Sequence, residues 1–244
     1  MSIRTDMAAE SFSQAGGAEK LQGVKVKNKV IENARLEVTD ITIETQEAAE
    51  KLGRPVGRYI TLTATDSTFD MYSDSFRERA EVIAKAIGEL CGDCERFLAV
   101  GLGNYALTSD AVGPLTAEKI FATRHIKSLA KEIDTDDLGE VTVIQTGVLG
   151  NTGIESSEQV KAIAERVTPQ AVIAVDALAC SELSNLGRTI QLCNTGISPG
   201  SGVENARKEL SLSTLGVKCI AIGVPTVIDL CTCLLYTSPK PTRL

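Results

Sequence analysis

Four short, mostly apolar runs constrain the fold of this chain more than any other feature. Between several of them lie segments in which apolar residues recur with the period of a helix. Continuous apolar strands separated by amphipathic helices are typical of a parallel sheet covered on both faces. The sequence therefore predicts an α/β fold with three layers, a mostly parallel sheet with helices on both faces. The four runs are residues 97–100, 141–144, 171–175 and 219–222.

Other segments carry the periods of amphipathic helices and of half-exposed strands. Apolar residues recur every three or four positions in 76–90, 115–133 and 158–167, which predicts three helices. Residues 35–43 and 58–63 largely alternate apolar and polar side chains, with turn-forming residues between them. This pattern predicts an antiparallel pair of strands at one edge of the sheet.

Charge and hydropathy limit the classes of function. The formal net charge of -7 disfavours direct binding of nucleic acid, which needs a basic surface. No apolar run reaches the roughly 18 residues needed to cross a membrane, and residues 1–20 lack the apolar stretch of a signal sequence. We therefore expect a cytoplasmic protein without a membrane partner.

The composition also suggests three regions along the chain. Residues 1–30 are mostly polar and predict a loosely ordered N-terminal arm. Residues 31–229 hold the predicted strands and helices, and form the expected α/β domain. Composition changes abruptly after Asp229, and we expect residues 230–244 to be a non-native tail.

The cysteines and the single histidine offer few candidates for a metal or redox site. Cys91 and Cys94 form one C-x-x-C pair, but a structural metal site needs four ligands and no second pair follows. His125 falls within a predicted helix between charged residues, where we expect a surface side chain. We therefore expect no metal and no cofactor.

Reactive groups in α/β folds collect at the carboxyl ends of the strands. Asp110 lies in a glycine-rich loop after the first apolar run, and Asp176 directly follows the third. Each has a structural alternative as a turn or helix-capping residue. If the two carboxylates converge, one pKa rises and the pair can share a proton, as the acid–base chemistry of peptide hydrolysis requires.

The glycine-rich loops leave a second class of function open, the binding of an anion or a nucleotide. Glycines allow the backbone to approach a ligand closely. However, the Gly101-x-Gly103 sequence has Ala106 where a dinucleotide-binding loop has its third glycine, and no phosphate-loop motif occurs. Peptide hydrolysis by the aspartate pair is the favoured hypothesis.

Sequence motifs at these loops resemble the spore germination protease family, the endopeptidases that degrade small acid-soluble spore proteins. The similarity appears in family order between about residue 3 and residue 229. The matching segments include Val100-Gly-Leu-Gly-Asn104, Thr108-Ser-Asp-Ala-Val-Gly-Pro114, Ile173-Ala-Val-Asp-Ala-Leu-Ala179 and Pro199-Gly-Ser-Gly-Val203, with residues 3–10, 57–62, 123–125, 153–155, 195–197, 207–211, 214–216 and 220–227.

The resemblance implies an atypical aspartic endopeptidase with a fold similar to that of hydrogenase maturation proteases. The family's proposed catalytic aspartates fall on Asp110 and Asp176. Family members are made as zymogens, and the processing site falls on Asp6 and Met7, which would make residues 1–6 a pro-segment. The resemblance also implies a homotetramer in the spore core or forespore cytoplasm, with DNA-coating spore proteins as substrates.

Two departures from the family pattern keep other readings open. Asn194 and Ser198 stand where the family usually has an aspartate and a histidine, and family members continue beyond the strand that ends near Asp229. The chain is therefore expected to be a fragment that lacks a C-terminal part. An inactive paralogue that acts as a binding module is the alternative function.

Overall fold

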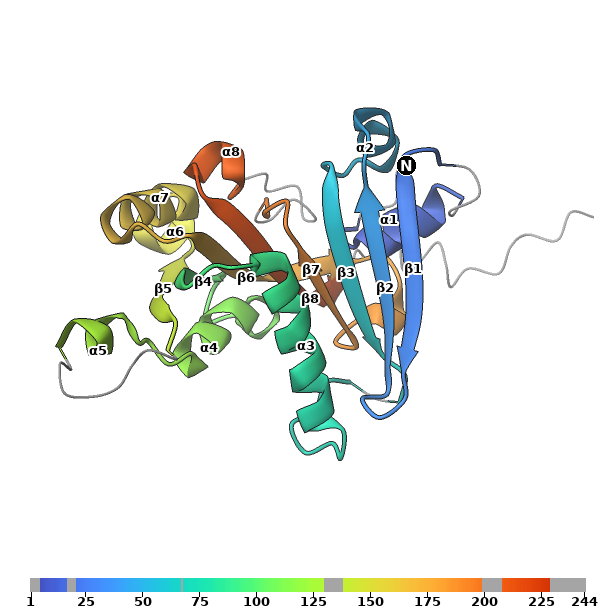
Figure 1. Ribbon diagram of the computed structural model, residues 1–244, viewed down its shortest axis with the longest axis horizontal. Helices are drawn as coiled ribbons and strands as arrows, with labels where there is room; N and C mark the ends of the chain where they lie inside the picture. Colours follow the sequence, from blue (N-terminus) through green and yellow to red (C-terminus); the bar gives the residue numbers. More distant parts are fainter. Residues whose placement is uncertain (1–4, 17–20, 67, 130–137, 199–207, 229–244) are drawn as a thin grey trace, which may run out of the picture.

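The computed structural model describes residues 5–16, 21–66, 68–129, 138–198 and 208–228. Within these ranges the strands form one eight-stranded sheet in the order β1-β2-β3-β7-β8-β6-β4-β5. Helices cover both faces of the sheet (Figure 1). The predicted α/β class is therefore confirmed. The strands are β1 (Val24–Ile31), β2 (Leu36–Ile43), β3 (Gly57–Ala64), β4 (Arg96–Leu102), β5 (Glu140–Gly147), β6 (Ala171–Cys180), β7 (Thr189–Cys193) and β8 (Lys218–Ile228).

The sheet is mixed, with a parallel half and an antiparallel half. Strands β5, β4, β6 and β8 are parallel neighbours, and they contain the four apolar runs on which the prediction rested. Strands β1, β2, β3 and β7 pair antiparallel, and β7 joins the two halves through its antiparallel pairing with β8. The expected mostly parallel arrangement therefore describes one half of the observed sheet. The antiparallel strands form the other half.

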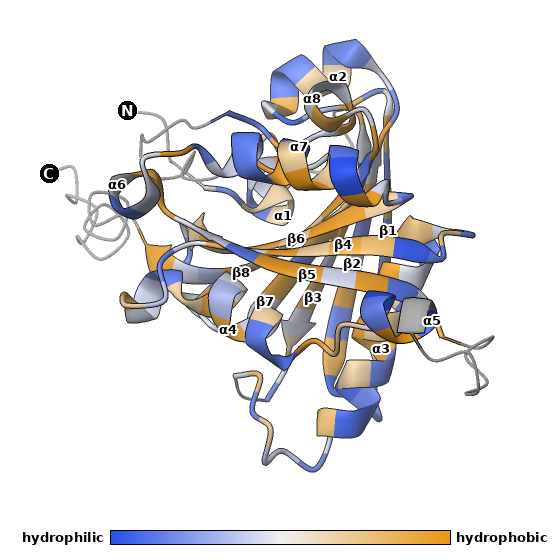
Figure 2. Ribbon diagram, turned by 90° about the vertical axis from the view of Figure 1, so that its left-hand side faces the viewer, coloured by the Kyte–Doolittle hydropathy of each residue, from blue (hydrophilic) through white to orange (hydrophobic). Residues whose placement is uncertain are grey.

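One layer of helices packs on each face, as Figure 2 shows. On one face, α1 and α2 pack against β2 and β3, and α7 packs against β4 and β6. On the other face, α3 covers β3, β7 and β8 while α4 lies against β4 and β6. The helices are α1 (Ala8–Gln14), α2 (Gln46–Leu52), α3 (Phe76–Cys91), α4 (Val112–Lys119), α5 (Arg124–Leu129), α6 (Leu149–Thr152), α7 (Ser156–Val167) and α8 (Leu212–Leu215).

The N-terminal region differs from the expected loose arm. Its described part contains helix α1 and strand β1, and β1 is the outer strand beyond the predicted pair of β2 and β3. Strand β1 carries Lys25, Lys27 and Lys29 at alternate positions. Lysines are typical of edge strands, because they discourage pairing with another chain. The expected tail at 230–244 lies outside the described residues.

The helix predicted over 115–133 is interrupted. Helix α4 ends at Lys119, α5 begins at Arg124, and Ile133 lies outside the described residues. Thr123 explains the break, because its side-chain oxygen donates to Gly139 O (2.5 Å) and accepts from Val141 N (2.9 Å). These contacts attach the segment to the start of β5 instead of continuing the helix.

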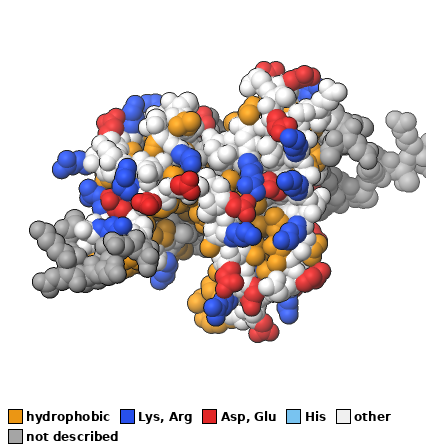
Figure 3. Space-filling view, viewed as in Figure 1, with side chains coloured by type: hydrophobic (Ala, Val, Ile, Leu, Met, Phe, Trp, Pro, Cys, Tyr) orange, Lys and Arg blue, Asp and Glu red, His pale blue; other side chains and the backbone are white. Residues whose placement is uncertain are grey.

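The first turn of α3 departs from the predicted apolar face. Phe76 is 51% exposed, whereas Arg79 is 2% exposed and donates to the carbonyl of Ala34 and to the Asp66 carboxylate. Met71, Tyr72 and Phe76 are exposed, and hydrophobic side chains gather near the bottom of Figure 3, where α3 begins in Figure 1. Acidic and basic groups are interspersed over the rest of that view.

Candidate functional site

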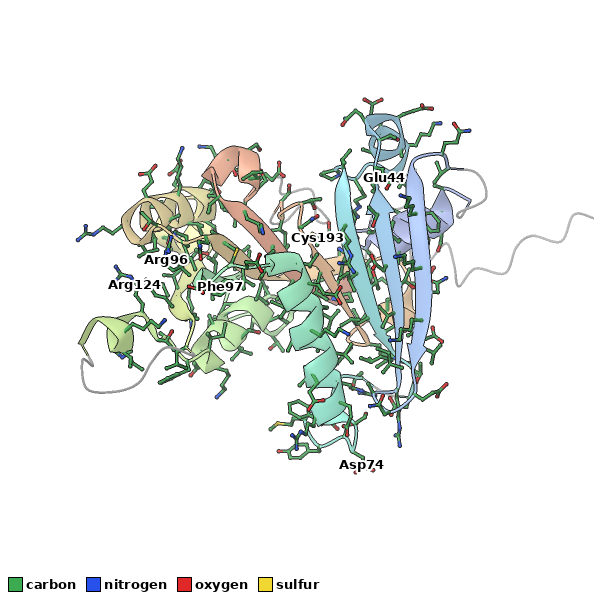
Figure 4. The ribbon with its side chains drawn as sticks, in the orientation of Figure 1. Glu44, Asp74, Arg96, Phe97, Arg124 and Cys193 are labelled. Carbon is green, nitrogen blue, oxygen red and sulfur yellow. The ribbon has the colours of Figure 1, made fainter. Side chains whose placement is uncertain are left out.

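A cavity of about 610 Å³ opens on the face of the sheet that carries α1 and α2. Its size lies within the range of small-molecule and peptide sites. Residues from the N-terminal segment, the end of α2, and strands β6, β7 and β8 line it. Cys193, labelled in Figure 4 on β7, lies where the two halves of the sheet meet and is one of the lining residues.

Asp176 is buried in this cavity, with 5% of its surface exposed. It lies within β6 and not just past a strand end as predicted, because pairing with β8 continues from Asp176 to Cys180. The pairing of β6 with β4, however, ends at Val175. Its Oδ1 accepts a hydrogen bond from Ala177 N (2.9 Å), which fixes the carboxylate relative to the strand.

Asp110 lies in the 3₁₀ turn η2 (Thr108–Asp110), between β4 and α4, and is half-buried. Its Oδ2 and its carbonyl both accept from Asn104 N, at 2.9 and 3.0 Å. This loop needs Gly103, whose φ is +110° and where a Cβ would lie 2.2 Å from the Asp110 carbonyl. The turn is therefore tightly built around the aspartate, which is not itself among the described residues that line the cavity.

Both aspartates lie at the same end of the parallel half of the sheet. Asp110 follows β4, and Asp176 lies on the neighbouring strand β6 at the point where β4 ceases to pair with it. Gly113, at the start of α4, holds the two segments close, because a Cβ there would lie 2.2 Å from Leu102 O and 2.4 Å from Val175 O. The two aspartates thus share one end of the sheet, and of the two only Asp176 lines the cavity.

The chain's own N-terminal segment forms part of the cavity wall. Thr5 and Asp6 line it, and Arg54 Nη2 donates to Thr5 O (2.6 Å). The backbone of Asp6 donates to Ala179 O (2.8 Å), and its carboxylate accepts from Ala179 N (2.8 Å). Met7 is 0% exposed and caps α1. The bond between Asp6 and Met7 is therefore held beside the strand that carries Asp176.

Glu10 attaches α1 to the loop after β6. Its carboxylate is 3% exposed and accepts from Ser181 N (2.8 Å), Ser181 Oγ (2.6 Å) and Asn185 Nδ2 (2.6 Å). The Thr5 hydroxyl also donates to it. Burial alone would raise the pKa of Glu10, but these hydrogen bonds outweigh burial and lower the pKa below 4.5. An ionised Glu10 therefore anchors the helix.

We expect Glu10→Gln to destabilise the protein at pH 7 by about 2 kcal/mol, since it removes a charge that accepts several buried hydrogen bonds. Because the folded-state pKa is lowered, this stabilisation is present above the unfolded pKa and lost as pH falls through the folded pKa. The difference in free energy of unfolding between wild type and variant should therefore shrink below pH 4.5. Denaturant titrations from pH 7 to pH 3 measure it.

Glu47→Gln is the matched control, because Glu47 has a lowered pKa but pairs with Lys51 on the surface. Exposed ion pairs contribute little to stability. The anchoring role of Glu10 would be contradicted if the loss in free energy of unfolding caused by Glu10→Gln stayed constant with pH. A loss equal to that caused by Glu47→Gln would also contradict it.

The loop after β7 closes one side of the cavity. Asn194 Oδ1 accepts from Arg58 N (2.8 Å) at the start of β3, so this side chain joins two strand ends. Thr195 and Ser198 line the cavity. Residues 199–203, which carry the next glycines, lie outside the described residues. Of the two positions that depart from the family pattern, Ser198 therefore contacts the cavity and Asn194 supports its rim.

Comparison with known sequences identifies the family. A sequence model of germination proteases matches residues 3–237. The chain belongs to the germination protease family. Membership makes the chain a peptidase with a role in spore germination, and both aspartates fall within the matched range.

Curated germination proteases align over nearly the whole chain. The protein from Clostridium tetani is 41% identical over 238 residues, which cover 95% of this chain and 72% of the relative. A Clostridium perfringens germination protease is 39% identical and covers 94% and 71% of the two chains. The one from Priestia megaterium is 38% identical and covers 93% and 64%.

A search of solved structures found the [NiFe] hydrogenase maturation protease HycI from Thermococcus kodakarensis KOD1. It is 19% identical, has a TM-score of 0.38, and covers 60% of this chain and 88% of that one.

Two other residues that the sequence singled out, His125 and Cys91, do not line the cavity of this germination protease. His125 is exposed on α5, which lies at the opposite side of the molecule from α1 in Figure 1. Cys91 is buried, and burial raises the pKa of its thiol. Across the ranges that the structure describes, His, Cys, Asp and Glu side chains form no group of three suited to a metal, and no helix there could span a membrane.

Three cavity or anchoring residues escaped sequence analysis, namely Arg54, Gln191 and Glu10. A sequence pattern does mark Gln191, since polar Thr189 and Gln191 alternate with apolar Ile190 and Leu192. That pattern indicates a polar position on a buried strand face. Arg54 and Glu10 left no such signal, because all the described hydrogen-bond partners of their side chains except Thr5 of Glu10 lie 43 to 175 residues away.

Proposed function

We propose that this chain is an aspartic-type endopeptidase that degrades small acid-soluble spore proteins during spore germination, with Asp110 and Asp176 activating water. The observation that carries the proposal is the burial of Asp176 in a cavity whose wall includes a peptide segment, residues 5 and 6 of the chain itself. A site that accepts an extended backbone beside a buried carboxylate is suited to peptide hydrolysis.

In the proposed mechanism, two aspartates share one proton. The ionised carboxylate takes a proton from water as the water oxygen bonds to the carbonyl carbon of the substrate. The protonated carboxyl donates its proton to the carbonyl oxygen. The tetrahedral intermediate then collapses: the carboxyl that took a proton from water gives it to the leaving nitrogen, the C–N bond breaks, and the other carboxylate regains a proton from the intermediate's hydroxyl as the new carboxyl group forms.

The contacts of the N-terminal segment support the proposal that the chain is made as a zymogen. In this proposal, the bond between Asp6 and Met7 is cleaved by the chain's own site, and removal of residues 1–6 frees the part of the cavity that Thr5 and Asp6 line. Arg54, which donates to Thr5 O, would then be available to a substrate carbonyl. We further propose that the enzyme acts as a homotetramer in the cytoplasm of the spore.

The charge of the cavity favours a peptidase over a binding site for anions or nucleotides. Among the residues that the structure describes, Asp6, Asp176 and Glu209 line it together with the cationic Lys51 and Arg54. Removal of residues 1–6 would leave two carboxylates against these two cations, so the described lining would carry no excess of positive charge. An anion would meet repulsion at the buried Asp176, whereas an uncharged peptide bond would not.

Purified chain incubated with a small acid-soluble spore protein tests the proposal. We expect fragments of the spore protein, preceded by a form of the chain whose first residue is Met7, both measured by mass spectrometry. Heat-denatured chain is the control for contaminating proteases. Intact spore protein in the presence of chain that has already lost residues 1–6 would refute the proposed substrate.

A further inference from the structure

Gln191 contacts both sides of the bond between Asp6 and Met7. Its Nε2 donates to Asp6 O (3.0 Å) and its Oε1 accepts from Ala8 N (2.5 Å). A carbonyl oxygen can only accept and an amide N–H can only donate, so these partners fix the orientation of the side-chain amide. Gln191 is 7% exposed, so both hydrogen bonds are sheltered from water.

The sheet places Gln191 on the same face as Asp176, two strands away from it. Gly223 on β8 pairs with Asp176 on one side and with Gln191 on the other. Residues that pair directly point to the same face of a sheet, and two strand spacings separate the outer pair by about 10 Å. Gly223 has no side chain of its own, and the Leu178 side chain lies over it, since a Cβ at Gly223 would be 2.3 Å from Leu178 Cδ1. Both side chains line the same cavity, as does Asp6.

We propose that Gln191 binds and polarises the carbonyl oxygen of the peptide bond to be cleaved, first at Asp6 of the chain itself and then in a protein substrate. This inference rests on the proposed function, because it takes the Asp6 carbonyl as that of a cleaved bond. Negative charge develops on this oxygen when water adds to the carbonyl carbon. A preorganised donor stabilises that charge more than it stabilises the neutral ground state.

A purely structural role for Gln191 makes a different prediction. Through Ala8 N, Gln191 also helps to hold α1 on the sheet. Gln191→Glu separates the two roles, because a carboxylate of the same shape still accepts from Ala8 N but cannot donate to Asp6 O while ionised. Once protonated, the introduced carboxyl can donate again. The ratio of variant rate to wild-type rate should therefore depend on pH only if the donated hydrogen bond matters.

The experiment follows the conversion of full chain to the form beginning at Met7, and the cleavage of a synthetic peptide of residues 1–12, between pH 7.5 and pH 5. We expect Gln191→Glu to lower kcat about 100-fold at pH 7.5 with KM changed less than threefold. The variant-to-wild-type ratio should rise as pH falls. Gln191→Met, which neither donates nor titrates, should show a similar loss at every pH.

Ser181→Ala is the matched control, because the Ser181 hydroxyl holds α1 through Glu10 (2.6 Å) and Gln14 (3.2 Å) without lining the cavity or contacting the Asp6 carbonyl. It should leave kcat unchanged. Rates are expressed per folded molecule, measured by circular dichroism, so a variant that folds poorly still gives a result. Wild-type kcat in both Gln191 variants, or a ratio that does not change with pH for Gln191→Glu, overturns the role of Gln191.

Asp176→Asn is measured in parallel to separate the two proposals. If this variant is inactive while both Gln191 variants cleave normally, the proposed peptidase stands and only the inference about Gln191 fails. If Asp176→Asn cleaves as fast as wild type, the proposed function fails, and the inference that rests on it fails as well.

Discussion

Asp176→Asn is expected to reduce the rate of peptide hydrolysis by about 1,000-fold, with little change in stability. The amide keeps the shape of the carboxylate, and its oxygen can still accept from Ala177 N, which Asp176 Oδ1 accepts at 2.9 Å. However, an amide cannot take a proton from water at neutral pH. The loss should therefore appear in kcat, measured on a spore protein or on a peptide that spans residues 1–12.

Asp93→Asn is the matched control for this substitution. Asp93 is exposed and precedes β4, at the amino end of the parallel strands and far from the cavity. The same change of one carboxylate to an amide should leave kcat within about twofold of wild type. Equal rates for Asp176→Asn and Asp93→Asn would contradict the assigned role of Asp176.

Gly113→Ala is expected to cause the largest loss of stability, about 3 kcal/mol or more. The added Cβ would lie 2.2 Å from Leu102 O, 2.4 Å from Val175 O and 2.6 Å from Leu102 N. These are backbone atoms of β4 and β6, which are paired on both sides and cannot move aside. Helix α4 would have to shift, and with it the turn that carries Asp110. Thermal unfolding and peptidase rate should therefore fall together.

Gly88→Ala is the control for the glycine change itself. Gly88 lies within α3, and a Cβ there would meet nothing within 4 Å. Alanine favours helix over glycine, so this variant should be more stable than wild type by about 0.5–1 kcal/mol. A wild-type unfolding midpoint for Gly113→Ala would show that α4 does not fix the position of the Asp110 turn.

The parallel half of the fold was predictable because each of its strands contains a short, mostly apolar run. The runs in β4, β5, β6 and β8 need no knowledge of their neighbours to be recognised. The antiparallel half was harder to predict. Strand β1 alternates Val24 and Val26 with lysines, and that pattern reads as a polar arm until β2 is known to pair with it.

The interruption between α4 and α5 has no marker in the sequence, since residues 120–123 contain no glycine or proline. It arises from the hydrogen bonds of Thr123 to the start of β5, which are contacts between segments distant in the chain. The position of Asp176 was misjudged for a similar reason. Pairing with β8 extends β6 past the aspartate, and no local pattern reveals how long the partner strand is.

The residues of the candidate site also include some that the sequence predicted and some that it did not. Asp110 and Asp176 were recognisable because each follows an apolar run in an α/β pattern. Gln191 and Glu10 gain their importance from contacts with residues 171 to 185 positions away. Such contacts depend on how the N-terminal segment docks against β6 and β7, and neither spacing nor composition encodes that docking directly.

The central claim is that Asp110 and Asp176 act on one water molecule. The most direct measurement is the separation of their carboxylate oxygens in a crystal of the enzyme bound to a non-cleavable peptide that spans residues 1–12. The account predicts one water within about 3.2 Å of both carboxylates and next to the carbonyl carbon of the sixth peptide residue. Carboxylates too far apart to share a single water, or a peptide carbonyl bound away from Asp176, would contradict it.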